Sequence, residues 1–315
     1  MKNISEILEN VKTVGIGGHI RPDGDCIGSC MALYLYIREY FPDIEADVYL
    51  EQPKPVFDYI DRMDEVKTEA EEEKEYDLFI TCDVSALDRL AVARKYFDAA
   101  KKTACIDHHA SNDGYADYNY ILPKASSASE VLYDLLDEDL IDKSIAEPMY
   151  MGIAHDSGVF RFQSTTPKTM RIAANMIEKG VNVNMILEET FFRKTYNQMM
   201  VTAKIQSEAV LALDGKCIYG YCTSEMMEEY GVTTKDLDAV VASIRNVDGV
   251  EVAMFLYQLS EDSYKVSLRS KNYVDVSKIA VENGGGGHVR AAGAEIHGEL
   301  NDIINKLLNR IKQDI

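Results

Sequence analysis

Short apolar runs alternate with helical segments along the first half of the chain, and this alternation limits the fold more than any other feature. Residues 11–18 (VKTVGIGG) have the pattern of a buried strand that ends in glycines, and a helical stretch follows over 25–40. Ser127 and Glu130 form a capping box that opens another helix, expected to extend to residue 140. Further strand-like runs are Ala46–Leu50, Tyr76–Cys82 and Lys102–Ile106. The alternation predicts an α/β domain with a parallel, doubly wound sheet.

The second half of the chain follows a different order. Helices dominate from Val159 onward, and the segment 196–213 is long enough to be a helical connector. The expected later elements are strands at 216–222, 250–259 and 264–269, a helix near 274–282, a glycine tract, one more strand and a final amphipathic helix at 301–311. The predicted domains are residues 1–195, the connector 196–213, and a smaller α/β domain at 214–315.

The composition is that of a globular protein. Apolar residues make up 46% and charged residues 27% of the 315 positions, which excludes a disordered chain and allows two cores. The longest apolar run, Val252–Tyr257, is far too short to cross a membrane. The first residues lack the features of a secretory signal, and the six cysteines show no CxxC spacing. We therefore expect a cytoplasmic protein with buried thiols and no membrane partner.

The net charge of −20 excludes non-specific binding of duplex DNA by a broad basic surface. A surface that holds duplex DNA non-specifically neutralises many phosphates with lysine and arginine, whereas this chain has 33 basic against 53 acidic groups. A pocket for a short phosphate chain needs only a few cations, and part of the acid excess can bind metal. The acidic run at 64–75 (DEVKTEAEEEKE) is interpreted as a solvated segment before a strand.

Ligand-type side chains follow three of the four predicted strands of the first domain. Ligands bind at the carboxyl ends of the strands in an open α/β sheet, so these side chains are expected to converge. So many carboxylates in one pocket repel one another unless cations neutralise them. Carboxylates and imidazoles without thiolates suit Mn²⁺ or a similar divalent ion, and two ions can share one carboxylate. The residues are His19, Asp23, Asp25, Asp83, Asp107, His108 and His109, with Asp156 from the motif HDSG.

Parts of this set have structural alternatives. Asp23 and Asp25 also fit a turn followed by a helix N-cap. A structural role for both His108 and His109 is harder to support, because adjacent side chains point in different directions. The segment Val14–Ile20 (VGIGGHI) has isoleucine at the third glycine position of a dinucleotide-binding fingerprint, and we discard that interpretation.

Six motifs spread over nearly the whole chain point to one family. They are GGHIRPDGDCIGS (17–29), TCDVSALDRL (81–90), IDHHASN (106–112), GIAHDSGVFRFQSTT (152–166), SLRSK (267–271) and GGGGHVRAAG (284–293). In this set and order the chain resembles the DHH family of phosphoesterases with the DHH-associated C-terminal domain. It is most similar to the bacterial type that acts as oligoribonuclease (nanoRNase) and as phosphatase of 3′-phosphoadenosine 5′-phosphate (pAp).

The resemblance implies a role for each polar residue of the first domain, with the active site in a cleft between the domains. Asp107 would orient the imidazoles, and His109 would contact the scissile phosphate or its leaving oxygen. The family often has threonine where this chain has His155, which we interpret as a packed core histidine. One metal ion would be held by His19, Asp23 and Asp83, and the other by Asp25, the bridging Asp83, His108 and Asp156.

The C-terminal domain is expected to hold the phosphates of the substrate. Arg269 in SLRS is a bidentate donor at a strand end, and His288 can reach an anion. Arg161 and Arg245 are weaker candidates that also fit plain surface ion pairs. The glycine run is either a flexible loop or a phosphate-binding backbone formed by Gly285, Gly286 and Gly287 after Gly284.

These features predict a metal-dependent phosphohydrolase with two divalent cations, manganese being the expected ion. The ions would activate a water near Asp83 for in-line attack on phosphorus, and Arg269 would neutralise the developing charge. The expected substrate is a short single-stranded RNA, degraded to mononucleotides, or pAp. The alternatives are a hydrolase of cyclic or linear dinucleotides, a single-strand DNA exonuclease, a manganese pyrophosphatase and a non-catalytic dinucleotide-binding module. The sequence leaves open the direction of degradation, the substrate length and whether the protein forms a homodimer.

Overall fold

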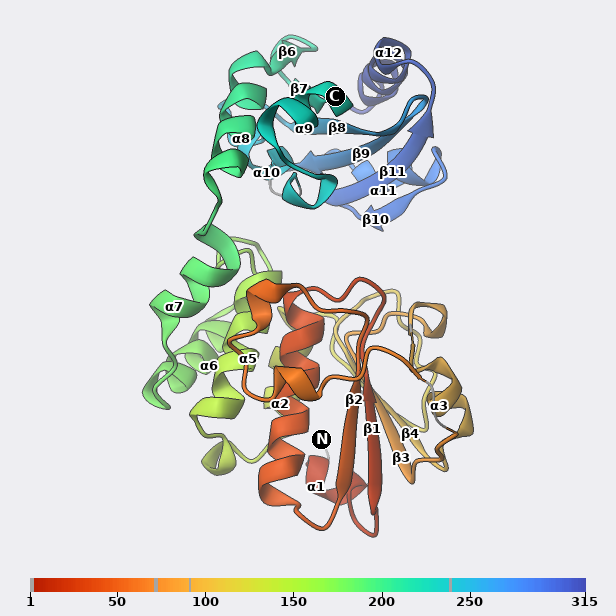
Figure 1. Cartoon of the computed structure of the whole chain (residues 1–315), viewed down its shortest axis with the longest axis vertical. Coiled ribbons are helices and arrows are strands. Elements are labelled where there is room, and N and C mark those ends of the chain that lie inside the picture. The colour runs from red at the N-terminus through yellow and green to blue at the C-terminus, as the bar shows by residue number, and fades with distance from the viewer. Residues whose placement is uncertain (1–2, 71–72, 91, 238–239) are drawn as a thin grey trace. The chain divides into compact units, whose positions relative to one another are not determined.

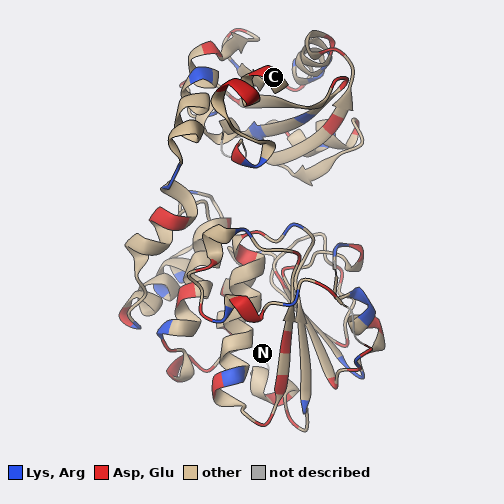
Figure 2. Cartoon of the chain, in the orientation of Figure 1, with Lys and Arg blue, Asp and Glu red and all other residues tan. Residues whose placement is uncertain are grey.

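The computed structural model describes residues 3–70, 73–90, 92–237 and 240–315 (Figure 1). The chain divides into two compact units, Met1–Arg193 and Lys194–Ile315. Acidic and basic residues are interspersed in both units (Figure 2). Within the described residues, no helix has both the length and the apolar character needed to cross a membrane.

The first unit contains a five-stranded sheet in the order β2-β1-β3-β4-β5, and every neighbouring pair is parallel. This confirms the predicted parallel, doubly wound sheet. Its strands are β1 (Thr13–Gly17), β2 (Glu45–Tyr49), β3 (Leu78–Cys82), β4 (Thr103–Asp107) and β5 (Tyr118–Ile121). Its helices are α1 (Ile4–Ile7), α2 (Gly24–Tyr40), α3 (Arg94–Ala99), α4 (Ala128–Tyr133), α5 (Lys143–Asp156), α6 (Pro167–Glu178) and α7 (Val183–Leu187).

Two apolar layers cover the two faces of this sheet. Strand β3 is buried at every position, with Ile80 in the layer formed with α2 and α5 and Phe79 in an aromatic layer that includes α3. Gly15 in β1 makes room for that aromatic layer, because a β-carbon there would lie 2.4 Å from the Phe79 ring. Both faces are therefore packed, as a parallel sheet requires.

Two predictions for this unit differ from the structure. Strand β5 was not predicted, because its exposed and half-buried residues lack an apolar run. The helix that begins after Ser127 ends at Tyr133, whereas an extension to residue 140 was expected. The Asp137 side chain accepts a bond from Asp139 N and caps a separate 3-10 turn, Glu138–Leu140, so the helix does not continue.

The second unit contains a six-stranded sheet in the order β10-β11-β9-β8-β7-β6, antiparallel except between β7 and β8. It confirms the smaller α/β domain expected at the C-terminus. Its strands are β6 (Val210–Ala212), β7 (Cys217–Cys222), β8 (Val252–Ser260), β9 (Ser263–Ser270), β10 (Gly286–His288) and β11 (Ala291–His297). Its helices are α8 (Tyr196–Glu208), α9 (Ser224–Tyr230), α10 (Val240–Ile244), α11 (Val276–Val281) and α12 (Leu300–Ile311).

The predicted helical connector at 196–213 is helical only in its first part. Helix α8 ends at Glu208, and β6 follows and pairs with β7. Val201 and Ile205 of α8 are buried in the same cluster as Phe255 of β8. Helix α8 therefore packs inside the second unit.

Candidate metal centre and phosphate-binding face

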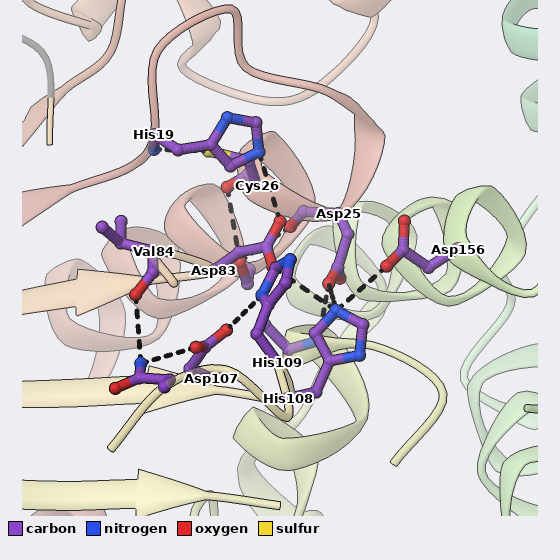
Figure 3. A network of polar contacts seen from close by, with 12 residues as sticks. His19, Asp25, Cys26, Asp83, Val84, Asp107, His108, His109 and Asp156 are labelled. Carbon is purple, nitrogen blue, oxygen red and sulfur yellow. Dashed lines mark hydrogen bonds and ion pairs between the residues drawn. The ribbon is translucent and has the colours of Figure 1, made fainter. Parts of the chain in front are cut away.

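The candidate metal centre lies at the carboxyl edge of the first sheet, where the strand order reverses. Strand β1 has β2 on one side and β3 on the other, and a crevice at such a point is the usual ligand site of an open α/β sheet. His19 follows β1, Asp83 follows β3, and Asp107 ends β4. Figure 3 shows that these side chains and those of Asp25, His108, His109 and Asp156 converge on one region.

Asp83 lies at the middle of this region and is 2% exposed. Its backbone is left-handed, with a φ of 59°, a strained conformation that aspartate tolerates better than most residues. Its Oδ2 lies 3.4 Å from His19 Nε2. Its Oδ1 lies 3.5 Å from both His108 Nε2 and His109 Nδ1. One carboxylate thus faces three imidazoles.

The start of α2 supplies two further carboxylates. Asp23 is the N-cap and accepts bonds from Asp25 N and Cys26 N, so the structural interpretation of this residue as a cap holds as well. Asp25 is fully buried and accepts bonds from Ala128 N at 2.5 Å and Ser129 N at 3.0 Å. Burial raises the pKa of Asp25 well above its usual value, and the nearby carboxylates of Asp83 and Asp156 raise it further.

Asp107 contacts one of the three imidazoles, that of His109. Its Oδ1 lies 2.8 Å from His109 Nδ1, and its Oδ2 accepts a bond of 2.6 Å from Asn112 Nδ2. Asn112 is buried and also donates to Val84 O. The sequence analysis missed Asn112, although it ends the same IDHHASN motif.

Asp156 and His155 end helix α5. Asp156 Oδ2 lies 3.1 Å from His108 Nε2, and Asp156 Oδ1 lies 3.4 Å from His155 Nδ1. The interpretation of His155 as a packed core histidine is wrong, because its side chain is 34% exposed and lies 4.0 Å from Asp23 Oδ1. The motif HDSG did not indicate this contact, because neighbouring residues of a helix usually point in different directions.

The electrostatics of the cluster fit bound divalent cations. Burial alone would lower the pKa of His108, but Asp156 and Asp83 raise it to about 12. Among the described residues, the buried atoms without a hydrogen-bond partner include Asp83 Oδ1 and His108 Nε2, which face each other. Buried polar atoms normally have partners, and a cation held by such donors supplies one.

Four groups of residues in this cluster have ligand atoms within 4.8 Å of one another. Two of them correspond to the expected ion sites, except that the second lacks Asp83. They are His19 with Asp23 and Asp83, Asp25 with His108 and Asp156, Asp83 with His108 and His109, and Asp23 with His155 and Asp156.

A second set of expected site residues shares one face of the second sheet. His288 in β10 pairs with Ala291 in β11, which pairs on its other side with Arg269 in β9. Residues directly opposite each other in antiparallel strands point to the same face. Arg269 and His288 are therefore on one face, separated by a small alanine.

The last two glycines of the tract, Gly286 and Gly287, lie in strand β10. A β-carbon on Gly285 would lie 2.1 Å from Gly293 O, and one on Gly287 would lie 2.5 Å from Ala291 O. These two glycines therefore allow close packing against β11. A β-carbon on Gly286 would meet nothing within 4 Å, so this position is open.

Strand alternation places Lys265 and Ser267 on the same face as Arg269, and the sequence analysis missed both. A β-carbon on Gly293 would lie 3.8 Å from Lys265 Nζ, so the ammonium group lies beside this strand. The alternation of Tyr264, Val266 and Leu268 with polar residues along the predicted strand could have identified them.

The two weaker candidates for phosphate binding, Arg161 and Arg245, lie in other segments of the chain than Arg269 and His288. Arg161 follows α5, is exposed, and donates to Gly158 O in its own loop at 3.0 Å. Arg245 follows α10 in the second unit and is half-buried.

The comparisons with known proteins agree with both units. Residues 13–153 match the DHH family N-terminal domain, and residues 214–314 match the DHHA1 domain. A Bacillus subtilis protein named bifunctional oligoribonuclease and PAP phosphatase NrnA is 29% identical over 291 residues, which cover 90% of each chain. A Thermus thermophilus protein of the same name is 28% identical over 321 residues, covering 100% of this chain and 94% of its own.

The fold also has a solved counterpart. The crystal structure of an exopolyphosphatase-related protein from Bacteroides fragilis has a TM-score of 0.89 at 22% identity and covers 98% of this chain and 95% of its own. The two domain matches together show that the chain belongs to the DHH family, with a DHH N-terminal domain followed by a DHHA1 domain.

Proposed function

We propose that this protein hydrolyses short oligoribonucleotides to mononucleotides and removes a phosphate from pAp, using two divalent cations. The observation that supports this most is the position of Asp83, whose carboxylate faces His19, His108 and His109 at 3.4 to 3.5 Å. The names of the full-length relatives from two bacteria support the substrate class.

Two sets of residues that share Asp83 would hold the two ions. Divalent cations bound there supply Lewis acidity to phosphoryl oxygens and lower the pKa of a water molecule. Asp83 would be shared, because its two oxygens face different imidazoles. We propose Mn²⁺ because the donor set mixes imidazole nitrogen with carboxylate oxygen. The ligand sets are His19, Asp23 and Asp83, and Asp25, Asp83, His108 and Asp156.

His109 is proposed to contact the reacting phosphate. Its Nδ1 lies 2.8 Å from Asp107 Oδ1, and Nε2 is the atom that we propose contacts a substrate oxygen. Burial lowers the pKa of His109, but the Asp107 contact outweighs it and raises the pKa above the usual value. A protonated imidazole held in this way donates a hydrogen bond to an anionic oxygen.

Arg269 and His288 are proposed to hold the part of the substrate that does not react. Both are on one face of the second sheet, with Lys265 and the open position Gly286 on the same face. A face with a guanidinium, an ammonium and small residues fits a phosphate chain. Gly285 and Gly287 would act indirectly, by allowing β10 to pack on β11. A cytoplasmic location belongs to this proposal, because short RNA and pAp are cytoplasmic substrates.

Product analysis tests the proposal. The manganese-loaded protein is incubated with end-labelled RNA of 2 to 24 nucleotides, with pAp, with linear and cyclic dinucleotides, with single-stranded DNA and with pyrophosphate. We expect mononucleotides from the shortest RNAs and AMP from pAp. Preferential hydrolysis of pyrophosphate, of long DNA or of a cyclic dinucleotide would replace the proposed substrate, and binding without turnover would show a non-catalytic module.

A further inference from the structure

His155 completes a ring in which carboxylates and imidazoles alternate. Asp83 contacts His19, which contacts Asp23 at 3.8 Å, and Asp23 contacts His155 at 4.0 Å. On the other side, His155 lies 3.4 Å from Asp156, and Asp156 lies 3.1 Å from His108. The ring closes where His108 lies 3.5 Å from Asp83. Each imidazole thus lies between two carboxylates.

His155 belongs to neither of the two ligand sets around Asp83. It lies on the opposite side of the ring, between one carboxylate of each set. We propose that Asp23, His155 and Asp156 bind a third divalent cation at the exposed rim of the centre. Their ligand atoms lie within 4.8 Å of one another.

The distances fit a single ion bound by three ligands. With metal–ligand bonds of about 2.1 Å, neighbouring ligand atoms are roughly 3 to 3.5 Å apart and opposite ones roughly 4.2 Å. The separations from His155 Nδ1 to Asp156 Oδ1 and Asp23 Oδ1 are 3.4 and 4.0 Å. Asp156 directs its other oxygen to His108, so it can serve two ions at once.

Gly24 leaves space for the His155 imidazole to approach the start of α2. A β-carbon on Gly24 would lie 2.7 Å from the His155 ring, so only glycine between the two aspartates of the α2 start allows the approach. The centroid of the Phe191 ring lies 6.0 Å from that of the imidazole. The close approach at Gly24 places the imidazole next to Asp23 and Asp156.

The charge of the centre leaves room for a third cation. Five aspartates converge there, and two divalent ions would neutralise four of their negative charges. A third ion would make the centre slightly positive, which favours an incoming phosphate. Because the His155 side chain is 34% exposed and that of Asp23 is 40% exposed, we expect this ion to bind more weakly than the other two. The five are Asp23, Asp25, Asp83, Asp107 and Asp156.

The number of bound ions tests the proposal without any assay of hydrolysis. The metal-free full-length protein is titrated with Mn²⁺, and the free ion is measured by electron paramagnetic resonance. We expect three ions per wild-type chain, one of them in a weaker class. Two ions in the wild type would overturn the proposal, whether or not the protein proves to be a phosphohydrolase.

Two substitutions separate metal binding from hydrogen bonding. His155→Gln keeps a donor for Asp156 but loses the ligand nitrogen, and His155→Ala loses both. We expect each variant to bind two ions with affinities within about threefold of the two tight wild-type sites. A third ion retained in both variants, or a large loss of affinity at the tight sites, contradicts the assignment. His297→Gln, at an exposed histidine of β11, is the control and should still bind three ions.

Discussion

His19 Nε2 lies 3.4 Å from Asp83 Oδ2, although the two residues follow different strands of the first sheet. Their strands, β1 and β3, are neighbours at the place where the strand order reverses. The sheet therefore builds the candidate centre from segments that are distant in sequence, and each of its side chains lies at or next to the end of a strand or helix.

The central position of Asp83 predicts that Asp83→Asn is folded but inactive. Asparagine tolerates the left-handed backbone at this position and keeps the shape of the side chain. It loses the charge shared between two ligand sets, and the loss of metal activation should lower kcat by roughly a thousandfold or more, about 1.4 kcal/mol per tenfold. Steady-state kinetics and thermal unfolding measure both effects.

The control for this variant is Asp88→Asn. Asp88 is exposed in the turn after β3, so its loss should change neither turnover nor stability. If Asp83→Asn retains half of the wild-type turnover, Asp83 does not have the bridging role.

Removal of metal should abolish activity, and Mn²⁺ should restore it better than Mg²⁺. The reason is that His19 and His108 add nitrogen to the donor set, while Mg²⁺ prefers oxygen ligands and water. The measurement is turnover of pAp after chelation, dialysis and addition of each ion at equal free concentration. Equal or better restoration by Mg²⁺ contradicts the manganese assignment.

The sequence predicted four strands of the first sheet, because each has a local apolar run. The polar residues that it placed at the ends of strands and helices do converge in the structure (Figure 3). Strand β5 was missed because its side chains are partly exposed, and the role of His155 depends on a contact with Asp23 from another helix. Such a contact is a property of packing, which one sequence does not display.

Asn112→Ala should lower kcat more than it changes KM. Asn112 Nδ2 holds Asp107, which in turn fixes His109 Nδ1, so the substitution loosens an imidazole that we expect to touch the reacting phosphate. The loss of a hydrogen bond to a charged group, about 1.5 to 3 kcal/mol, corresponds to roughly ten- to a hundredfold in kcat. Asn305→Ala, at an exposed asparagine of α12, is the control and should leave kcat unchanged. An effect on stability alone would mean that Asn112 only supports the loop.

The second unit should become less stable at acidic pH, because Glu251 becomes protonated there. This carboxylate is 2% exposed and accepts backbone bonds from Asn272, Tyr273 and Val274. Burial raises its pKa, but these bonds outweigh burial and hold the pKa below its usual value. Its stabilising contribution is therefore complete above the unfolded pKa of about 4.3 and is lost as the pH falls through the folded pKa.

Glu251→Gln tests this pH dependence. At pH 7 the variant should unfold at a lower temperature than the wild type, because a neutral amide replaces the charged acceptor of several N–H groups. The difference in Tm should shrink as the pH falls below about 4, where the wild-type carboxylate also becomes neutral. A Tm difference that is the same at pH 7 and pH 3 would show that the charge of Glu251 is not responsible.

The phosphate-binding face predicts a difference between substrates. Arg269→Ala or His288→Ala should impair cleavage of short RNA and pAp far more than hydrolysis of bis-p-nitrophenyl phosphate, because a small ester draws little binding energy from residues remote from the reacting phosphorus. Losing a charge-assisted hydrogen bond costs about 1.5 to 3 kcal/mol, which corresponds to a roughly ten- to hundredfold drop in kcat/KM for the nucleotide substrates alone. Part of the loss should fall on kcat, since remote binding energy also positions the phosphorus. Lys306→Ala on α12, at an exposed lysine, is the matched control. Equal losses on both kinds of substrate would mean that Arg269 and His288 support the fold or the metal centre, and their assignment to substrate binding would have to be abandoned.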